Sequence, residues 1–228
     1  MRGMKQGNAI DASLRHVIFR PDSGGTRWPT IIAFHGRGTD ENDLLPLIEA
    51  LHLEEYAVIS ARAPHRFGSG SLMGGYTWYE IGEEGIPDQG TFLSSVELVR
   101  HFMIEIKSGY PIDSEKMFLL GFSQGAVISY AIGLMDPTQV RGIVALSGYV
   151  PYRSGLPLKL DGLGNLCVFA SHGAWDEIIP VELGRTSAEL LKKAGAKLDY
   201  HEYPMGHQVL DETLHDLKAW MNGIVRSS

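Results

Sequence analysis

The chain has 228 residues, of which 44% are hydrophobic and 21% are charged, and its formal net charge is -7. This composition predicts a packed core and excludes a disordered chain, and the length suits a single α/β domain over residues 1–228. The absence of any Lys/Arg block disfavours nucleic acid as a partner, and the single cysteine, Cys167, excludes an internal disulfide and multi-cysteine metal sites.

The first segment of the chain has no apolar stretch of the length that a secretory signal needs. No window approaches 18 consecutive apolar residues, so we expect no transmembrane segment. A cytoplasmic location is therefore the expectation.

Strand-like and helix-like patterns alternate along the chain. Continuous apolar runs predict buried parallel strands at residues 30–34, 57–60, 117–120, 142–146 and 166–170, because both faces of such strands are covered. Alternating segments at residues 16–20 and 198–203 predict an edge or hairpin strand and a strand near the other edge. Helical spacing of apolar residues predicts helices at residues 42–53, 91–108, 124–134, 181–194 and 209–221. We expect an α/β fold in three layers, with helices on both faces of a mainly parallel central sheet.

One long connection, residues 63–90, interrupts this alternation. It contains seven glycines, two prolines and the aromatic residues Tyr76, Trp78 and Tyr79, without periodicity. Such connections are uncommon inside compact domains and are often binding loops or lids. A disordered surface loop is the alternative, but it gives no reason for three close aromatic residues. We therefore expect a wall or lid of a substrate pocket, with Met73 and the three aromatic residues as substrate contacts.

The sequence of residues 121–125, GFSQG, matches the G-x-S-x-G pattern. It lies between a predicted strand and a predicted helix, where a sharp turn exposes the serine hydroxyl at the carboxyl end of the sheet. The flanking glycines let strand and helix approach, and the helix N-terminus favours a developing oxyanion. A chance glycine turn is the alternative, but the strand before and the helix after make Ser123 a specific candidate nucleophile.

A serine nucleophile needs a base, and in such folds the chain order is serine, acid, histidine. His207 lies in a Pro/Gly loop directly after the strand at residues 198–203, where a general base belongs. His201 falls inside that strand and His215 inside the last helix, where structural or surface histidines are usual. His207 is therefore the candidate base.

The acid is expected in the loop after the strand at residues 166–170. Asp176 stands there, before a predicted helix. It could merely cap that helix, and Glu177, Asp199 and Asp211 are rival acids. We expect Asp176 to hold the tautomer of the histidine and to stabilise its protonated form.

A glycine-rich turn, residues 35–40, follows the strand at residues 30–34, which we expect to lie beside the strand of the nucleophile. Backbone N–H groups of such a turn, with that of the residue after the serine, can stabilise an oxyanion. We expect the donors to be Arg37 and Gln124. The side chain of Arg37 could also point at an anionic group of the substrate.

His35, Asp40 and Glu41 could suggest a metal site. Their spacing matches no established pattern of metal ligands, so a histidine that stabilises the turn is favoured and no metal is expected.

These landmarks make the chain similar to the phospholipase/carboxylesterase family of α/β-hydrolases over roughly residues 29–223. The matching stretches are FHGRGTDENDLLPL, DSEKMFLLGFSQGA, HGAWDEIIP and YPMGHQVLDETLHDLKAWM. The resemblance implies an α/β-hydrolase fold and a cofactor-free esterase or thioesterase that acts through an acyl-enzyme. The long aromatic connection looks more like the bacterial carboxylesterases than the thioesterases that remove palmitate from proteins. Dienelactone hydrolases are also similar, but they use cysteine where this chain has Ser123.

Three functions compete at this point. The leading hypothesis is a carboxylesterase for small-molecule esters with short or medium acyl chains, which Trp175 and the aromatic connection would contact. A long-chain lysophospholipase or acyl-protein thioesterase is the second, and a non-catalytic homologue that only binds a ligand is the third. Whether the chain forms a homodimer is left open.

Overall fold

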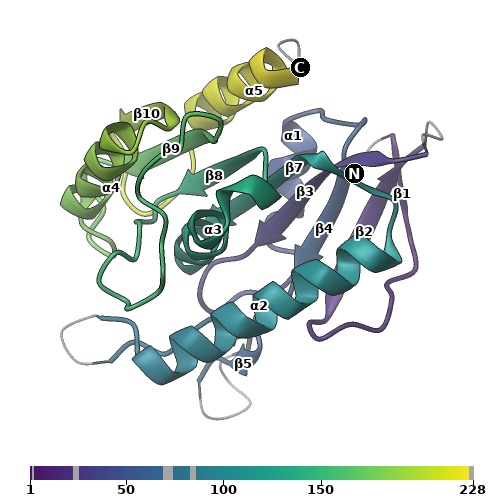
Figure 1. Ribbon diagram of the computed structural model, residues 1–228, viewed down its shortest axis with the longest axis horizontal. Helices are drawn as coiled ribbons and strands as arrows, with labels where there is room; N and C mark the ends of the chain where they lie inside the picture. The colour runs from purple at the N-terminus through teal and green to yellow at the C-terminus, as the bar shows by residue number, and fades with distance from the viewer. Residues whose placement is uncertain (2, 23–25, 69–73, 83–85, 226–228) are drawn as a thin grey trace.

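The computed structural model describes residues 1, 3–22, 26–68, 74–82 and 86–225. Within these ranges one sheet has eight strands in the order β1-β2-β4-β3-β7-β8-β9-β10 (Figure 1). The strands are β1 (Met4–Gln6), β2 (His16–Pro21), β3 (Trp28–Phe34), β4 (Ala57–Ala61), β7 (Ile112–Phe122), β8 (Gly142–Leu146), β9 (Cys167–Gly173) and β10 (Lys197–Tyr203).

The sheet is mainly parallel, as predicted. Every pairing from β4 across to β10 is parallel, whereas β2 runs antiparallel to β4 and β1 antiparallel to β2. All residues of β4 and β8 are buried, as expected for strands covered on both faces. β2 lies one place in from the edge because β1 covers it. β1 was not predicted, since its three mostly exposed residues give no alternation that a sequence pattern could reveal.

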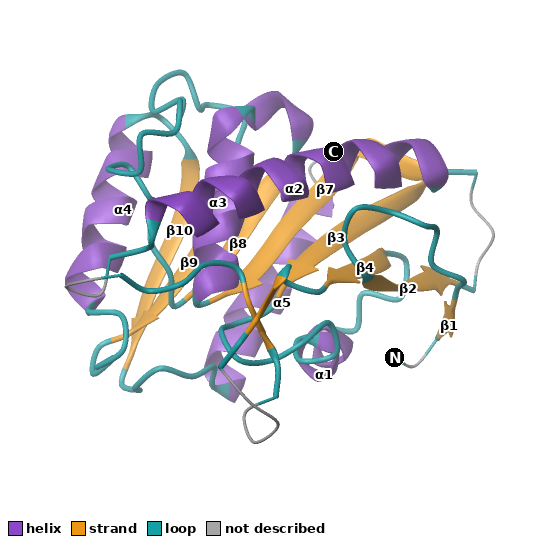
Figure 2. Ribbon diagram, turned by 90° about the horizontal axis from the view of Figure 1, so that it is seen from below, coloured by secondary structure: helices purple, strands orange, loops and turns teal. Residues whose placement is uncertain are grey.

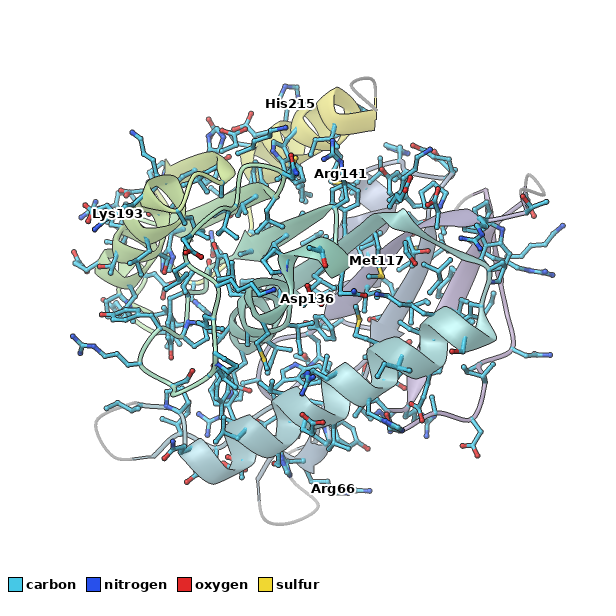
Figure 3. All side chains as sticks on the ribbon, in the orientation of Figure 1. Arg66, Met117, Asp136, Arg141, Lys193 and His215 are labelled. Atoms are coloured by element: carbon cyan, nitrogen blue, oxygen red, sulfur yellow. The ribbon has the colours of Figure 1, made fainter. Side chains whose placement is uncertain are left out.

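Helices cover both faces of the sheet and complete the three layers (Figure 2). They are α1 (Leu45–Ala50), α2 (Gln89–Gly109), α3 (Gln124–Met135), α4 (Val181–Lys193) and α5 (Asp211–Val225). One apolar core contains side chains of α2, α3 and α4, and a second core on the opposite face contains side chains of α1 and α5. Figure 3 shows these side chains between the helices and the sheet, with Met117 of β7 fully buried.

The first helix is shorter than the predicted helix at residues 42–53. Residues 41–44 form turns before α1, and Pro46 occupies the first turn of the helix. His52 has a positive φ of 53° just after the helix, which prevents the helical conformation from continuing.

The connection at residues 63–90 carries short regular structure that the sequence did not predict. β5 (His65–Arg66) and β6 (Tyr76–Thr77) form an antiparallel pair, and Thr39 is bridged to Tyr76. Gly38 N–H donates to Tyr76 O over 2.8 Å, and Tyr76 N–H donates to Thr39 O over 2.8 Å. The hairpin is therefore fastened to the turn after β3 by backbone hydrogen bonds. Two-residue strands are too short to show a period in the sequence.

Candidate active site

A sharp turn places Ser123 between β7 and α3. Its backbone has φ 55° and ψ -120°, a region that residues other than glycine rarely adopt. A Cβ added to Gly125 would overlap the carbonyl oxygen of Phe34, and one added to Gly121 would overlap the carbonyl group of Gly125. Glycine is thus required on both sides of the serine, because strand and helix meet there without room for a side chain.

Three side chains predicted from the sequence form an unbroken chain of hydrogen bonds. Ser123 Oγ lies 2.8 Å from His207 Nε2, and His207 Nδ1 lies 2.7 Å from Asp176 Oδ2. The carboxylate is fully shielded from solvent, and 17% of the His207 side chain is exposed. With Nδ1–H donating to the carboxylate, Nε2 carries a free lone pair that can accept the serine proton.

Asp176 also organises its own loop. Its Oδ1 accepts hydrogen bonds from the amides of Ile178 and Ile179, both over 2.9 Å, while Oδ2 faces the histidine. Asp176 therefore does not cap α4, because the two amides lie in the loop before the helix and no side chain caps its start. α4 begins after Pro180, which stands at the N-cap rather than in the first turn.

The other candidate acids and bases lie elsewhere. Glu177 is exposed, although it is the next residue in the chain. His201 contacts Asp199 at 2.8 Å on β10, and His215 is exposed on α5 (Figure 3).

His172, at the end of β9, was not predicted to take part in the site. Only 1% of this residue is exposed, and its Nε2 lies 2.8 Å from Ile179 O and 3.5 Å from Asp176 Oδ2. It therefore ties the end of the loop that carries Asp176 back to the strand where the loop begins. Its position directly before that loop was the available signal, but a histidine at the end of a buried strand is indistinguishable from an ordinary core residue.

The turn after β3 lies against the nucleophile. A Cβ added to Gly36 would lie 3.7 Å from Ser123 Cβ and 3.1 Å from the ring of Phe122. The Gly36–Arg37 peptide thus adjoins the serine, as predicted for a segment on the neighbouring strand. Gln124 begins α3, so its N–H is one of the first-turn amides that have no intrahelical partner.

His35 is held by both ring nitrogens. Nδ1 lies 2.6 Å from Gly36 O, and Nε2 accepts from the amide of Ala63 over 3.0 Å. The ring is fully buried, and burial lowers its pKa below the usual 6.5, which favours the neutral form. Both nitrogens are engaged within the protein, which fits a histidine that stabilises the turn. Glu41, which the rejected metal hypothesis would have used, accepts from Nε and Nη2 of Arg62 over 2.5 and 2.6 Å.

The side chain of Gln124 holds the aromatic connection. Its Oε1 accepts from Trp78 N–H over 3.0 Å and lies 2.9 Å from Thr77 Oγ1, and its Nε2 donates to Tyr79 O over 2.8 Å. The sequence indicated only the backbone of Gln124, because contacts across 45 or more residues leave no local pattern.

Two of the predicted substrate contacts belong to the core. Trp78 and Tyr79 are 0% and 2% exposed, and the Trp78 indole donates to His35 O over 2.9 Å. Burial raises the pKa of Tyr79 well above its usual 10, so its phenol stays protonated. Both rings are enclosed by protein rather than open to solvent. Trp78 supports the turn after β3 from behind, whereas the Tyr79 ring packs against Phe92 of α2.

The remaining predicted substrate contacts differ in their exposure to solvent. Tyr76 is half-buried beneath the guanidinium of Arg62, 4.4 Å from its ring centre, and Trp175 is 68% exposed beside Asp176. Met73 lies outside the described residues. The exposed side chain of Arg37 stacks 4.7 Å over the ring of Phe67, next to the hairpin.

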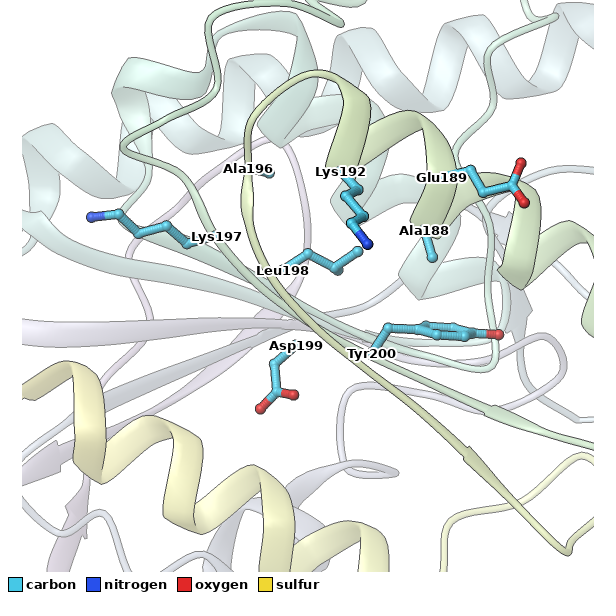
Figure 4. Close-up of a pocket in the computed structure, with 8 residues that line it drawn as sticks. All are labelled: Ala188, Glu189, Lys192, Ala196, Lys197, Leu198, Asp199 and Tyr200. Atoms are coloured by element: carbon cyan, nitrogen blue, oxygen red, sulfur yellow. The ribbon is translucent and has the colours of Figure 1, made fainter.

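A hollow of about 740 Å³ lies away from these residues. Its walls come from Ala188, Glu189 and Lys192 of α4 and from residues 196–200, at the edge of the sheet that β10 forms (Figure 4). It contains none of the three hydrogen-bonded side chains, so we assign it no part in the site. In the described part of the chain, the helices are too short or too polar to cross a membrane.

Comparisons with known proteins match most of the chain. A family model described as phospholipase/carboxylesterase matches residues 21–224. Acyl-protein thioesterase 1 of Debaryomyces hansenii is 32% identical over 164 residues, covering 67% of this chain and 70% of the relative. Acyl-protein thioesterase 1 of Mycosarcoma maydis is 27% identical and covers 93% of this chain and 98% of the relative. The carboxylesterase of Bacillus cereus superposes with a TM-score of 0.79 at 26% identity, covering 92% of this chain and 94% of that one.

Proposed function

Because the chain belongs to the phospholipase/carboxylesterase family and is a carboxylic ester hydrolase, we propose that it works through an acyl-enzyme on Ser123. The observation that carries this proposal is the relay from Ser123 Oγ to His207 Nε2, 2.8 Å, and from His207 Nδ1 to Asp176 Oδ2, 2.7 Å. A hydroxyl becomes a competent nucleophile when a base within this distance takes its proton.

In the first half of the reaction, Ser123 Oγ attacks the ester carbonyl carbon while its proton moves to His207 Nε2. The buried carboxyl group of Asp176 would stabilise the imidazolium that results. The C–O bond to the leaving alcohol then breaks as Nε2 returns the proton to the alcohol oxygen. The acyl group remains on the serine.

In the second half, His207 takes a proton from water, and the hydroxide attacks the acyl carbon. The bond to Ser123 Oγ breaks, the serine regains a proton from Nε2, and the carboxylic acid leaves. Each half passes through a tetrahedral oxyanion, which the amides of Arg37 and Gln124 would stabilise. The N-terminus of α3 adds favourable electrostatic potential at the same place.

We propose short or medium acyl chains as the preferred substrates. The buried ring of Trp78, which contacts Phe34 and His35, fills volume behind the turn after β3, and this supports a limited acyl site on that side. Small-molecule esters therefore fit better than long chains. The cytoplasmic location stays a prediction.

A specific observation also supports the second candidate, hydrolysis of long acyl chains. Trp175 and Ile178, on either side of Asp176, are 68% and 71% exposed and could contact a longer chain. The relatives named acyl-protein thioesterase 1 make this the natural alternative.

Two assays test the proposal. Wild type and Ser123→Ala are treated with a fluorophosphonate probe, and p-nitrophenyl esters from acetyl to palmitoyl are compared by kcat/KM. We expect labelling of the wild type alone and a maximum at short or medium chains. Activity that rises steadily to palmitoyl would favour the second candidate, and a wild type that resists the probe would favour a ligand-binding homologue.

A further inference from the structure

One carbonyl oxygen beside the nucleophile is held by two side chains. Gly36 O lies 2.6 Å from His35 Nδ1 and accepts from Thr39 Oγ1 over 3.0 Å. The two side chains also contact each other, with Thr39 Oγ1 3.1 Å from His35 Nδ1. None of these hydrogen bonds involves Ser123, His207 or Asp176.

The protonation of His35 follows from its second nitrogen. Ala63 N–H points at Nε2 over 3.0 Å, so Nε2 must be an acceptor and Nδ1 must carry the proton. Nδ1–H therefore donates to Gly36 O. The two donors on this oxygen are held separately: the Ala63 amide, two residues after β4, holds His35, and the turn itself holds Thr39.

The carbonyl of Gly36 and the amide of Arg37 belong to one peptide group. That group is planar and trans, since the described residues include no cis peptide, so its C=O and N–H point in opposite directions. Two donors that hold the oxygen toward His35 and Thr39 therefore turn the Arg37 N–H toward the opposite side. The position of Gly36, whose added Cβ would lie 3.7 Å from Ser123 Cβ, sets this peptide beside the nucleophile.

We infer that His35 and Thr39 are positioning residues that aim the Arg37 N–H at the oxyanion. This inference rests on the proposed function, because it assigns to that reaction the orientation of one of its donors. An amide that is already aimed needs no reorganisation when charge develops, which is the source of its effect on the transition state. The Thr39 hydroxyl then acts on the rate of reaction rather than on substrate binding.

The test compares Thr39→Val, which is isosteric but lacks the hydroxyl, with Thr39→Ser, which retains it. Steady-state kinetics on p-nitrophenyl butyrate give kcat and KM, and phenylboronic acid serves as a probe that forms a tetrahedral adduct with the serine. We expect kcat of Thr39→Val to fall about 10-fold, below the 10²–10³-fold typical when a donor is removed entirely, because His35 still holds the oxygen. KM should change less than twofold, and the boronic acid Ki should rise about as much as kcat falls. Thr39→Ser should stay within threefold of wild type for kcat and Ki.

A second pair of variants, at His35, tests the same inference if Thr39→Val fails to fold. His35→Asn places an amide N–H near the position of Nδ1, whereas His35→Leu has no donor, so kcat should be at least 10-fold higher for His35→Asn. Thr138→Val, in the short 3-10 helix Pro137–Gln139 and exposed, controls for the general effect of replacing a threonine by valine.

The outcomes separate the two proposals. Suppose that the wild type is active and is labelled by the probe. Equal kcat values for Thr39→Val and Thr39→Ser, or an effect on KM alone, would then overturn the positioning role and leave the proposed function in place. A wild type without esterase activity or labelling would overturn the proposed function and this inference with it.

Discussion

Replacing Asp176 by asparagine separates its two contacts. One carboxylate oxygen accepts from the amides of Ile178 and Ile179, and the other accepts from His207. Asparagine keeps an oxygen for the two amides but presents an NH₂ group to His207. Because that NH₂ group can only donate, His207 Nδ1 must become the acceptor, and its proton moves to Nε2, where it blocks acceptance of the serine proton.

The expected magnitudes differ widely for activity and stability. In a triad of this type the wrong histidine tautomer lowers kcat by about 10⁴-fold, or about 5 kcal/mol. Asp176→Asn keeps both loop hydrogen bonds and should unfold within about 1 kcal/mol of wild type. Asp176→Ala loses both bonds, each worth about 0.5–1.5 kcal/mol, and should be less stable by about 1–3 kcal/mol.

Turnover of p-nitrophenyl butyrate and thermal unfolding measure the two effects on the same samples. For a chain of this size 1 kcal/mol corresponds to a shift in Tm of about 2–4 °C. If Asp176→Asn retained more than a tenth of the wild-type kcat, the carboxylate would serve only the loop, and the proposed relay would be wrong. Glu177→Gln, one residue away and exposed, is the matched control and should leave both measurements near wild type.

Three further outcomes are expected. The free energy of unfolding of Ser123→Gly, measured by thermal denaturation, should be about 1 kcal/mol higher than that of Ser123→Ala, because glycine adopts the φ of 55° freely. Equal values would argue against strain at this turn. Gln124→Met should lower the free energy of unfolding, measured in urea, by about 2–4 kcal/mol, because Trp78 N–H loses its acceptor. The control Gln139→Met replaces an exposed glutamine and should lower it by less than about 0.5 kcal/mol. Burial lowers the pKa of both His35 and His16 below the usual 6.5, so the unfolded state binds protons more readily than the folded state. The free energy of unfolding should therefore fall as pH drops below about 6.5, and it should level off below the folded-state pKa of these residues. Urea unfolding at several pH values should show this slope and its reduction in His16→Gln, whereas an unchanged slope would contradict it.

The parts of the site that the sequence predicted share one property. Ser123, Asp176 and His207 each follow a recognisable strand, and the carboxyl ends of parallel strands meet at one edge of a sheet. The resemblance to the phospholipase/carboxylesterase family, carried by the motifs around these residues, is confirmed by the family match over residues 21–224.

The parts that the sequence could not predict depend on contacts between distant segments. His172 reads as a core residue until the loop beyond it folds back, and the side chain of Gln124 meets the aromatic connection 45 residues away. The contacts of the aromatic residues could not be predicted for a related reason. Composition indicates that Trp78 and Tyr79 must be buried against something, but it does not say whether that partner is a substrate or the protein itself.

The hairpin of β5 and β6 is joined to the turn after β3 through main-chain groups of Gly38, Thr39 and Tyr76. Such bonds do not use side chains, although they require glycine at position 75, where an added Cβ would overlap Gly38 O. Mutations can therefore alter the surface that the hairpin presents to solvent while the turn beside Ser123 keeps its shape. Because Tyr76 of this hairpin is a predicted substrate contact, such substitutions are expected to change substrate preference before they disturb the hydrogen bonds of Ser123.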